Sequence, residues 1–139
     1  GNTRRRQKDK SQAREGADNL KPVLQANPDV TAIVGINAGS GAAAGTAVKE
    51  LGLEDKIIIV TQDRDDITLQ LIDEGVIKST VVTRSAVNTY YGLLTLYQYN
   101  HYDVPITEDN KGANVVWLPG DIDVGTFVVN KDNTSYFYK

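Results

Sequence analysis

Polar side chains stand at the ends of three apolar, strand-like segments of the sequence, residues 31–36, 56–61 and 78–83. These side chains belong to Asn37, Gln62, Asp63, Arg64 and Thr83. An amide, a carboxylate, a guanidinium and a hydroxyl group offer hydrogen-bond donors and acceptors in fixed directions. A neutral ligand with many hydroxyl groups needs both kinds of partner, so this set of residues predicts a sugar.

A purely structural role is the alternative for each of these positions. Asp63 and Ser85 stand where they could cap the helices that follow them. The carboxyl ends of parallel strands, however, meet at one edge of a sheet, where open α/β folds bind ligands. This expected convergence favours ligand binding over capping.

The sequence offers little that supports catalysis. The single histidine, His101, lies in a polar segment between two tyrosines, and there is no cysteine to act as a nucleophile. Ser40 lies in Gly39-Ser40-Gly41, which lacks the Gly-x-Ser-x-Gly pattern of a hydrolase elbow. We therefore expect neither an enzyme nor a metal site.

A glycine-rich segment, residues 39–45, leaves a second function open. It follows a strand, opens a helix, and is followed by Asp63 at about the distance of a ribose-binding acid in a dinucleotide site. Its spacing is Gly-x-Gly-x-x-x-Gly, and Asn37 and Ala38 separate it from the strand. The plainer interpretation is that its glycine and alanine residues let a helix pack close to the sheet.

Composition limits the class of protein. The 139 residues are 40% apolar and 24% charged, which is typical of one globular domain. A net charge of -3 gives no basic footprint for nucleic acid. The local basic run at residues 3–10 is interpreted as a solvated, frayed start, and no segment is long and apolar enough for a membrane span.

Helical and strand-like patterns alternate along the chain, which predicts an α/β fold: a doubly wound parallel sheet flanked by helices on both faces. Helices are expected at residues 11–25, with Ser11 as the cap, and at 42–51, 65–75 and 86–99. Extended pieces at residues 114–118 and 124–129 and a polar, aromatic end at 130–138 break the alternation.

Four segments resemble, in the same order, motifs of the sugar-binding periplasmic proteins of the ribose, galactose and xylose type. Residues 27–33 read NPDVTAI, and residues 58–63 read IIVTQD, where the family has a strand that ends in an aspartate. Residues 75–81 read GVIKSTV, and residues 122–133 read IDVGTFVVNKDN. The resemblance covers nearly the whole chain.

The resemblance implies specific ligand contacts. In the family, a strand-end asparagine, the aspartate and a polar residue of the next strand hydrogen-bond sugar hydroxyls, which carries over to Asn37, Asp63 and Thr83. Gln62 stands where the family has an aromatic residue, and Ala38 stands where it often has an aspartate. The resemblance implies binding without catalysis and without a cofactor.

The family has two lobes that close on the ligand about a hinge, and this chain resembles the carboxyl-terminal half. Residues 1–113 would then form one ligand-binding lobe, incomplete at its start. Residues 114–139 would form hinge-return strands and a tail that packs on the amino-terminal lobe. The implied partners are a monosaccharide, that amino-terminal lobe, and a membrane permease of an ABC transporter or a sensor kinase, with no direct contact to nucleic acid.

The implied location is periplasmic or extracellular, which is compatible with attachment as a lipoprotein. Lactose-repressor-like regulators share this fold in their effector domains, so an effector-binding lobe is an alternative function. A dinucleotide-binding enzyme domain, based on residues 39–45, is the other alternative.

Overall fold

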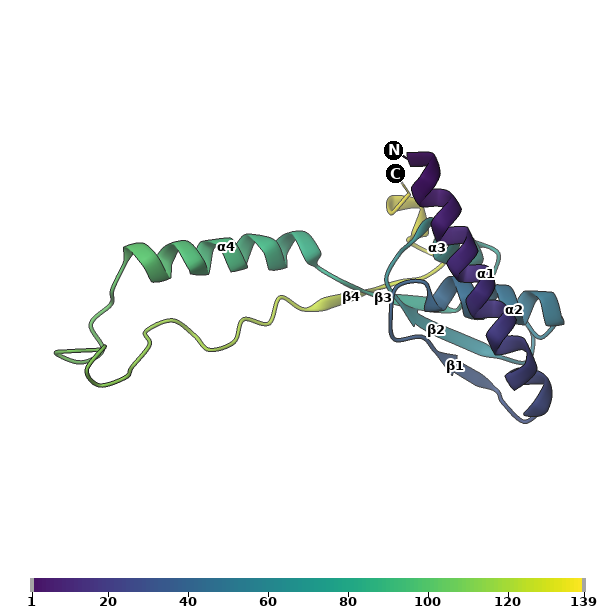
Figure 1. The fold of residues 1–139 in the computed structure, drawn as a ribbon, viewed down its shortest axis with the longest axis horizontal. Coiled ribbons are helices and arrows are strands. Elements are labelled where there is room, and N and C mark those ends of the chain that lie inside the picture. The colour runs from purple at the N-terminus through teal and green to yellow at the C-terminus, as the bar shows by residue number, and fades with distance from the viewer. Residues whose placement is uncertain (1, 139) are drawn as a thin grey trace. The chain divides into compact units, whose positions relative to one another are not determined.

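The computed structural model describes the backbone of residues 2–138 and the side chains of residues 13–138 (Figure 1). Four α-helices, four strands and one 3-10 helix lie in this part of the chain. In order, they are α1 (Asn2–Ala26), β1 (Ala32–Val34), α2 (Ser40–Leu51), β2 (Ile58–Gln62), α3 (Asp66–Asp73), β3 (Ser79–Thr83), α4 (Ser85–His101), β4 (Thr126–Val129) and η1 (Thr134–Tyr136).

The chain divides into two compact units. The first unit comprises the described residues up to Val82 and those from Phe127 onward, and the second comprises Thr83–Thr126. The boundary expected between residues 113 and 114 separates a ligand-binding lobe from hinge-return strands, and it stays a prediction. In the structure, the described residues from Phe127 onward belong to the first unit.

The sheet has the strand order β1-β2-β3-β4. The pairs β1–β2 and β2–β3 are parallel, with Val34 opposite Val60 and Gln62 opposite Val81. Because α2 and α3 connect these parallel neighbours, each connection is a strand–helix–strand crossover. The predicted α/β class with a parallel sheet and flanking helices is confirmed.

Helices α2 and α3 contact each other, and α2 packs against β2 and α1. The core between them is aliphatic, and its largest fully buried side chains include Ile59, Ile72, Ile77 and Val48. A Cβ atom placed on Gly16 of α1 would lie 2.7 Å from the Cβ atom of Ala43, so the two helices approach almost backbone to backbone. Small residues at this crossing thus set the spacing between α1 and α2.

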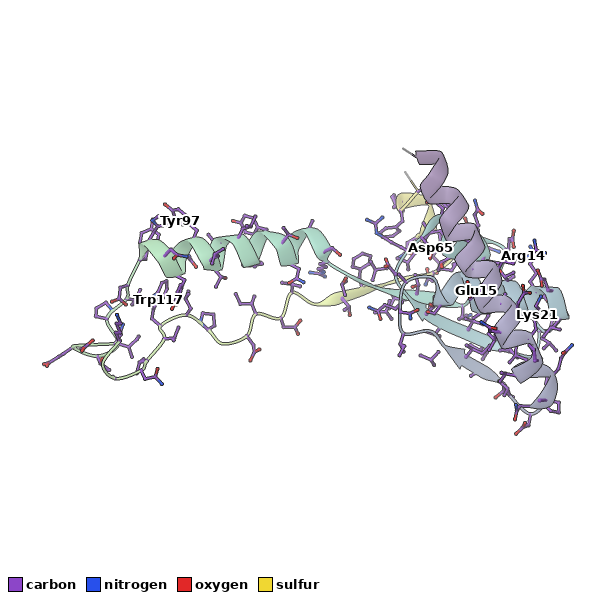
Figure 2. The ribbon with its side chains drawn as sticks, in the orientation of Figure 1. Arg14, Glu15, Lys21, Asp65, Tyr97 and Trp117 are labelled. Atoms are coloured by element: carbon purple, nitrogen blue, oxygen red, sulfur yellow. The ribbon has the colours of Figure 1, made fainter. Side chains whose placement is uncertain are left out.

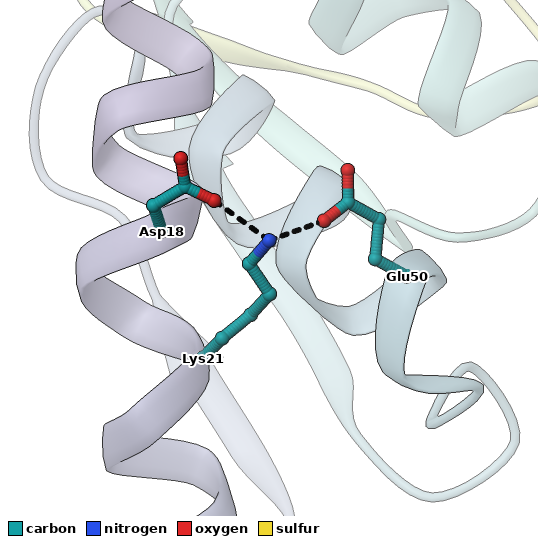
Figure 3. A network of polar contacts seen from close by, with 3 residues as sticks. All are labelled: Asp18, Lys21 and Glu50. Atoms are coloured by element: carbon teal, nitrogen blue, oxygen red, sulfur yellow. Dashed lines mark hydrogen bonds and ion pairs between the residues drawn. The ribbon is translucent and has the colours of Figure 1, made fainter.

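An ion-pair network joins the same two helices (Figure 3). The Lys21 ammonium lies 2.7 Å from the Asp18 carboxylate in α1 and 2.5 Å from the Glu50 carboxylate in α2. The hydrogen bond and charge of Lys21 lower the pKa of Asp18, and hydrogen bonds to Asp18 and Glu50 raise the pKa of Lys21. The two carboxylates are exposed and Lys21 is only half-buried, so the network contributes orientation more than stability.

Helix α1 is longer than the sequence predicted. It begins at Asn2, so the expectations of a frayed start at residues 3–10 and of a cap at Ser11 are wrong. Residues 2–12 contain neither glycine nor proline, and their Arg, Lys and Gln residues favour helix. Pro22 lies inside the helix, where it removes one backbone hydrogen bond, but buried Ala17 and Leu24 hold both sides of it in the core.

The two faces of the sheet differ in burial. Ile59 is fully buried against the helices, whereas its neighbour Ile58 is 61% exposed and Val34 is 72% exposed. Alternate residues of a strand point to opposite faces, so one face of the sheet carries the core and the other presents aliphatic side chains to solvent. The sequence predicted helices on both faces of the sheet. Within the described residues, the connecting helices α2 and α3 lie over one face of the sheet.

The second unit contains α4 and the irregular segment that follows it. No residue of α4 is buried, although the helix carries several tyrosines and leucines, among them Tyr97 (Figure 2). The side chain of Asn110 is buried and organises the next loop, accepting from the backbone N–H groups of Ile106 and Thr107 and donating to Asp103. Within the described residues, no helix has the length and apolar character that a membrane crossing needs.

Candidate ligand-binding site

Asn37 lies in the turn between β1 and α2, at the carboxyl end of its strand. The Ser40 hydroxyl donates to the Asn37 carbonyl oxygen at 2.6 Å and lies 3.3 Å from the Thr61 hydroxyl of β2. A Cβ atom on Gly35 would overlap with both hydroxyl oxygens, so only glycine leaves room for this arrangement. Asn37 is therefore fixed to the sheet through Ser40 and Thr61, while its own side chain is exposed.

Asp63 follows β2 directly and has an unusual backbone conformation. Its φ angle is 77°, in the left-handed region that residues other than glycine rarely adopt. Its N–H donates to the Val81 carbonyl oxygen at 3.0 Å, and the buried Thr80 hydroxyl donates to its carbonyl oxygen at 2.5 Å. Strain that is held in place by neighbours in this way is concentrated at functional sites.

The carboxylate of Asp63 is not used as a helix cap. One of its oxygens accepts from the backbone N–H of Arg64 at 2.8 Å. The cap of α3 is Asp65, which accepts from the Thr68 backbone N–H at 3.0 Å and the Thr68 hydroxyl at 2.7 Å. The capping role considered for Asp63 is therefore wrong, and its exposed carboxylate stands at the sheet edge.

The strand register brings Asn37 and Asp63 to one edge of the sheet. Val34 of β1 is opposite Val60 of β2. Asn37 follows Val34 by three residues, and Asp63 follows Val60 by three residues, so the two lie at the same end of adjacent strands. Thr83 is the last residue of β3 and the first residue of the second unit. Its hydroxyl lies 3.4 Å from that of Ser85, which opens α4 without acting as its cap.

The remaining two predicted residues flank Asp63 and differ from each other. Gln62 ends β2 with an exposed side chain. The Arg64 guanidinium lies over the ring of Phe137, 5.8 Å from its centroid. The sequence predicted Arg64 as a site residue but gave no indication that the end of the chain would contact it.

Close helix packing explains the glycine motif of residues 39–45. A Cβ atom on Gly41 would lie 2.8 Å from Thr61 Cγ2 and 2.8 Å from Thr68 Oγ1, and one on Gly45 would lie 2.6 Å from Leu71 Cδ1. Gly39, with a φ angle of 86°, makes the turn into α2. Each of these glycines thus has a steric or conformational reason within the fold itself.

Sequence reasoning missed the residues that hold the site, above all Ser40, Thr61 and Thr80. Their signal was a set of hydroxyl residues in or beside apolar strands, where valine or isoleucine would otherwise be expected. A hydroxyl group at such a position needs a partner, and here the partners are backbone and side-chain atoms of the strand ends.

The structure also describes two features that are not part of this candidate site. A surface depression is lined by residues that precede β2 and β3, including Asp55 and Gly75, and therefore lies at the amino ends of the strands. The His101 ring packs on Tyr97 in the second unit, with 4.3 Å between ring centroids. Among the side chains described, no group of three His, Cys, Asp or Glu residues is arranged to hold a metal ion.

Several solved structures that this chain resembles are named as sugar-binding or solute-binding proteins. A sugar-binding protein of a sugar ABC transporter from Bacillus halodurans superposes with a TM-score of 0.76 at 27% identity, covering 91% of this chain and 42% of its own. AraP, an arabinose binding protein from Geobacillus stearothermophilus, gives 0.73 at 28% identity with the same coverage. An ABC transporter solute binding protein from Agrobacterium vitis with bound D-fucose gives 0.66 at 25% identity, covering 88% of this chain and 38% of its own.

This chain thus spans about two fifths of the length of the solved proteins that it matches. Comparison with curated protein sequences gives no match. The model of the periplasmic binding protein domain matches residues 5–101, well over half of the chain. The chain belongs to the periplasmic binding protein domain family.

Proposed function

We propose that this chain forms part of a solute-binding protein that holds a monosaccharide or a similar small polar ligand. The observation that carries the proposal is Asp63, an exposed carboxylate on a left-handed residue that the neighbouring strand holds at the carboxyl edge of the sheet. A carboxylate only accepts hydrogen bonds, and sugar hydroxyl groups supply the donors. Family membership and the printed names of the solved neighbours support the same ligand class.

A single sheet edge contacts a small ligand from one side only. Ligand pockets enclose most of the surface of what they bind, so a second lobe must supply the opposite wall. Closure of two lobes around a hinge would then report occupancy to a membrane permease of an ABC transporter or to a sensor kinase. Such a protein acts in the periplasm or outside the cell as a binding protein and not as an enzyme.

The test is isothermal titration of sugars into the protein that contains this chain and a second lobe. Arabinose and D-fucose are the first probes, because solved neighbours are named for binding them. Replacement of Asp63 by alanine leaves sugar hydroxyls unpaired, which corresponds to about 1.5–3 kcal/mol. We expect Kd to rise about 10- to 150-fold in Asp63→Ala.

Two further variants make the result specific. Asp63→Asn keeps a residue type that tolerates the left-handed conformation, so a comparable loss of affinity assigns the effect to the charge. Asp55→Ala removes an exposed carboxylate at the opposite end of the strands and should leave Kd unchanged. Wild-type affinity in Asp63→Ala would contradict the proposed site.

A further inference from the structure

The last residues of the first unit, 130–138, form a tail that is fastened to α3 (Figure 1). The Asn133 side chain accepts from the Asn130 backbone N–H at 2.9 Å and closes a turn. Thr134, which is 2% exposed, donates its hydroxyl to Asp73 at 2.5 Å. The Tyr138 hydroxyl donates to the other oxygen of Asp73, so one carboxylate of α3 holds the tail at two points.

Phe137 lies between these two attachment points and is held from the side of β4. Its ring stacks on that of Phe127, with centroids 5.5 Å apart and planes 20° apart. Both rings pack against the buried side chains of Leu69, Val82 and Val129. The position of the Phe137 ring is thus determined by β4, by α3 and by the ends of the tail.

Arg64 lies on this ring, directly after Asp63 in the chain. The 5.8 Å between its guanidinium carbon and the ring centroid is within the range of a cation–π contact. Its side chain is half-buried, while the neighbouring Asp63 is exposed. A long, flexible side chain at the candidate site is therefore held against a platform that the tail provides.

We propose that the tail positions Arg64 as a ligand contact, with Phe137 as the positioning residue. The proposal rests on the proposed function and adds a specific division of roles. Asp63 only accepts hydrogen bonds, whereas the ring oxygen of a sugar only accepts them and so needs a donor from the protein. The Arg64 guanidinium supplies up to five N–H donors next to Asp63, and Phe137 reduces the number of directions in which they point.

A double-mutant cycle separates positioning from simple stabilisation of the fold. The variants Arg64→Ala, Phe137→Leu and the double variant are titrated with arabinose and D-fucose in the two-lobed protein. We expect Kd to rise about tenfold or more in Arg64→Ala, and about two- to fivefold in Phe137→Leu. With Arg64→Ala in place, Phe137→Leu should change Kd no further. Phe137→Leu should lower Tm by the same amount in the wild-type background and in the Arg64→Ala background. Tyr136→Ala, at a tail residue that is 84% exposed, is the matched control and should leave Kd unchanged.

A measurement without ligand tests the positioning step alone. The order parameter of the Arg64 Nε–H bond, measured by ¹⁵N NMR on this chain, should fall in Phe137→Leu and stay unchanged in Tyr136→Ala. An unchanged order parameter in Phe137→Leu overturns the positioning role. Sugar binding that is unaffected by Arg64→Ala overturns the ligand contact and leaves the proposed function standing. Absence of binding by the wild-type protein for every sugar, with a fall in the order parameter, overturns the proposed function and the ligand contact together.

Discussion

At the scale of single residues, the candidate site combines strain with support. The left-handed conformation of Asp63 costs about 1–2 kcal/mol for an ordinary residue and somewhat less for aspartate. Thr80 and Val81 of β3 offset this cost through two hydrogen bonds to the Asp63 backbone. The site therefore depends on a hydroxyl group that has no direct contact with solvent.

Thr80→Val should test this support. The variant keeps the shape of the buried side chain but removes the hydroxyl donor to the Asp63 carbonyl oxygen, so we expect the free energy of unfolding to fall by about 1–2 kcal/mol. Urea denaturation followed by circular dichroism measures the change. Thr80→Ser, which keeps the hydroxyl group, should lose less stability than Thr80→Val. The reverse order would contradict a supporting role for this hydrogen bond.

A pair of glycine substitutions should distinguish close packing from helix propensity. In Gly41→Ala the new Cβ atom would meet Thr61 and Thr68 at 2.8 Å, which should destabilise the protein by about 1–3 kcal/mol. Gly92 of α4 has no atom within 4 Å of the same position, so Gly92→Ala should be neutral or add up to about 1 kcal/mol through helix propensity. Thermal unfolding of both variants gives the comparison, and equal effects would rule out packing as the reason for Gly41.

The sequence predicted Asn37 and Asp63 as candidate site residues but gave no prediction for the residues that hold them. Both follow apolar, β-branched segments. Ligands bind at the carboxyl ends of parallel strands, so the position of a residue directly after such a segment is enough to make it a candidate. The role of Thr80 depends on the register that sets Thr61 opposite Thr80, and that of Ser40 depends on the distance between α2 and β2. Register and distance come from three-dimensional packing, which a single sequence does not contain.

At the scale of elements, the alternation of helices and strands was predictable and the ends were less so. β1 covers three residues instead of the expected six. The Gly35 N–H still donates to the Val60 carbonyl oxygen at 2.9 Å, and the bend and turn into α2 follow at residues 37–39. β2 extends through Gln62 because its pairing with β3 continues to Val81. Residues from Phe127 onward pack within the first unit, where Asp73 accepts from the hydroxyl groups of Thr134 and Tyr138.

The attachment of the tail should depend on pH at both extremes. Hydrogen bonds from Thr134 and Tyr138 lower the pKa of Asp73 below its usual 3.8, so the stability they contribute is present above that value and is lost as pH falls through the lowered pKa. Partial burial and the hydrogen bond to Asp73 raise the pKa of Tyr138 to about 12, helped by the charges of Asp66 and Glu74. The corresponding contribution is present below pH 10, the ordinary pKa of tyrosine, and is lost as pH rises toward 12.

NMR shifts of the Thr134 methyl group, recorded against pH, should therefore be flat at neutral pH and change below about pH 4 and above about pH 10. Asp73→Asn has no carboxylate to protonate, so its acid-side change should disappear. Persistence of the acid-side change in Asp73→Asn would assign it to another group.

At the scale of the whole molecule, each of the two units presents exposed apolar side chains. In the first unit these belong to the outer face of β1 and β2, and in the second to α4, where Leu93 is 64% exposed. Contiguous exposed apolar surface of this kind marks sites of interaction with other protein segments. The solved proteins that this chain matches are more than twice as long as this chain.

The outer face of the sheet gives the sharpest test of this interpretation. Val34 and Ile58 are 72% and 61% exposed, so the double variant Val34→Thr, Ile58→Thr should change the free energy of unfolding by no more than about 0.5 kcal/mol per site. It should also reduce the fluorescence of bound ANS, because the dye binds exposed apolar surface. Ile59→Thr, next in sequence but fully buried on the opposite face, should lose about 2 kcal/mol or more and increase ANS fluorescence.

Equal ANS fluorescence in the double variant and the wild type would mean that the dye binds elsewhere, and the apolar residues of α4 would then be the surface to test. Loss of the signal in the double variant would instead identify the outer sheet face as the apolar surface that the dye binds.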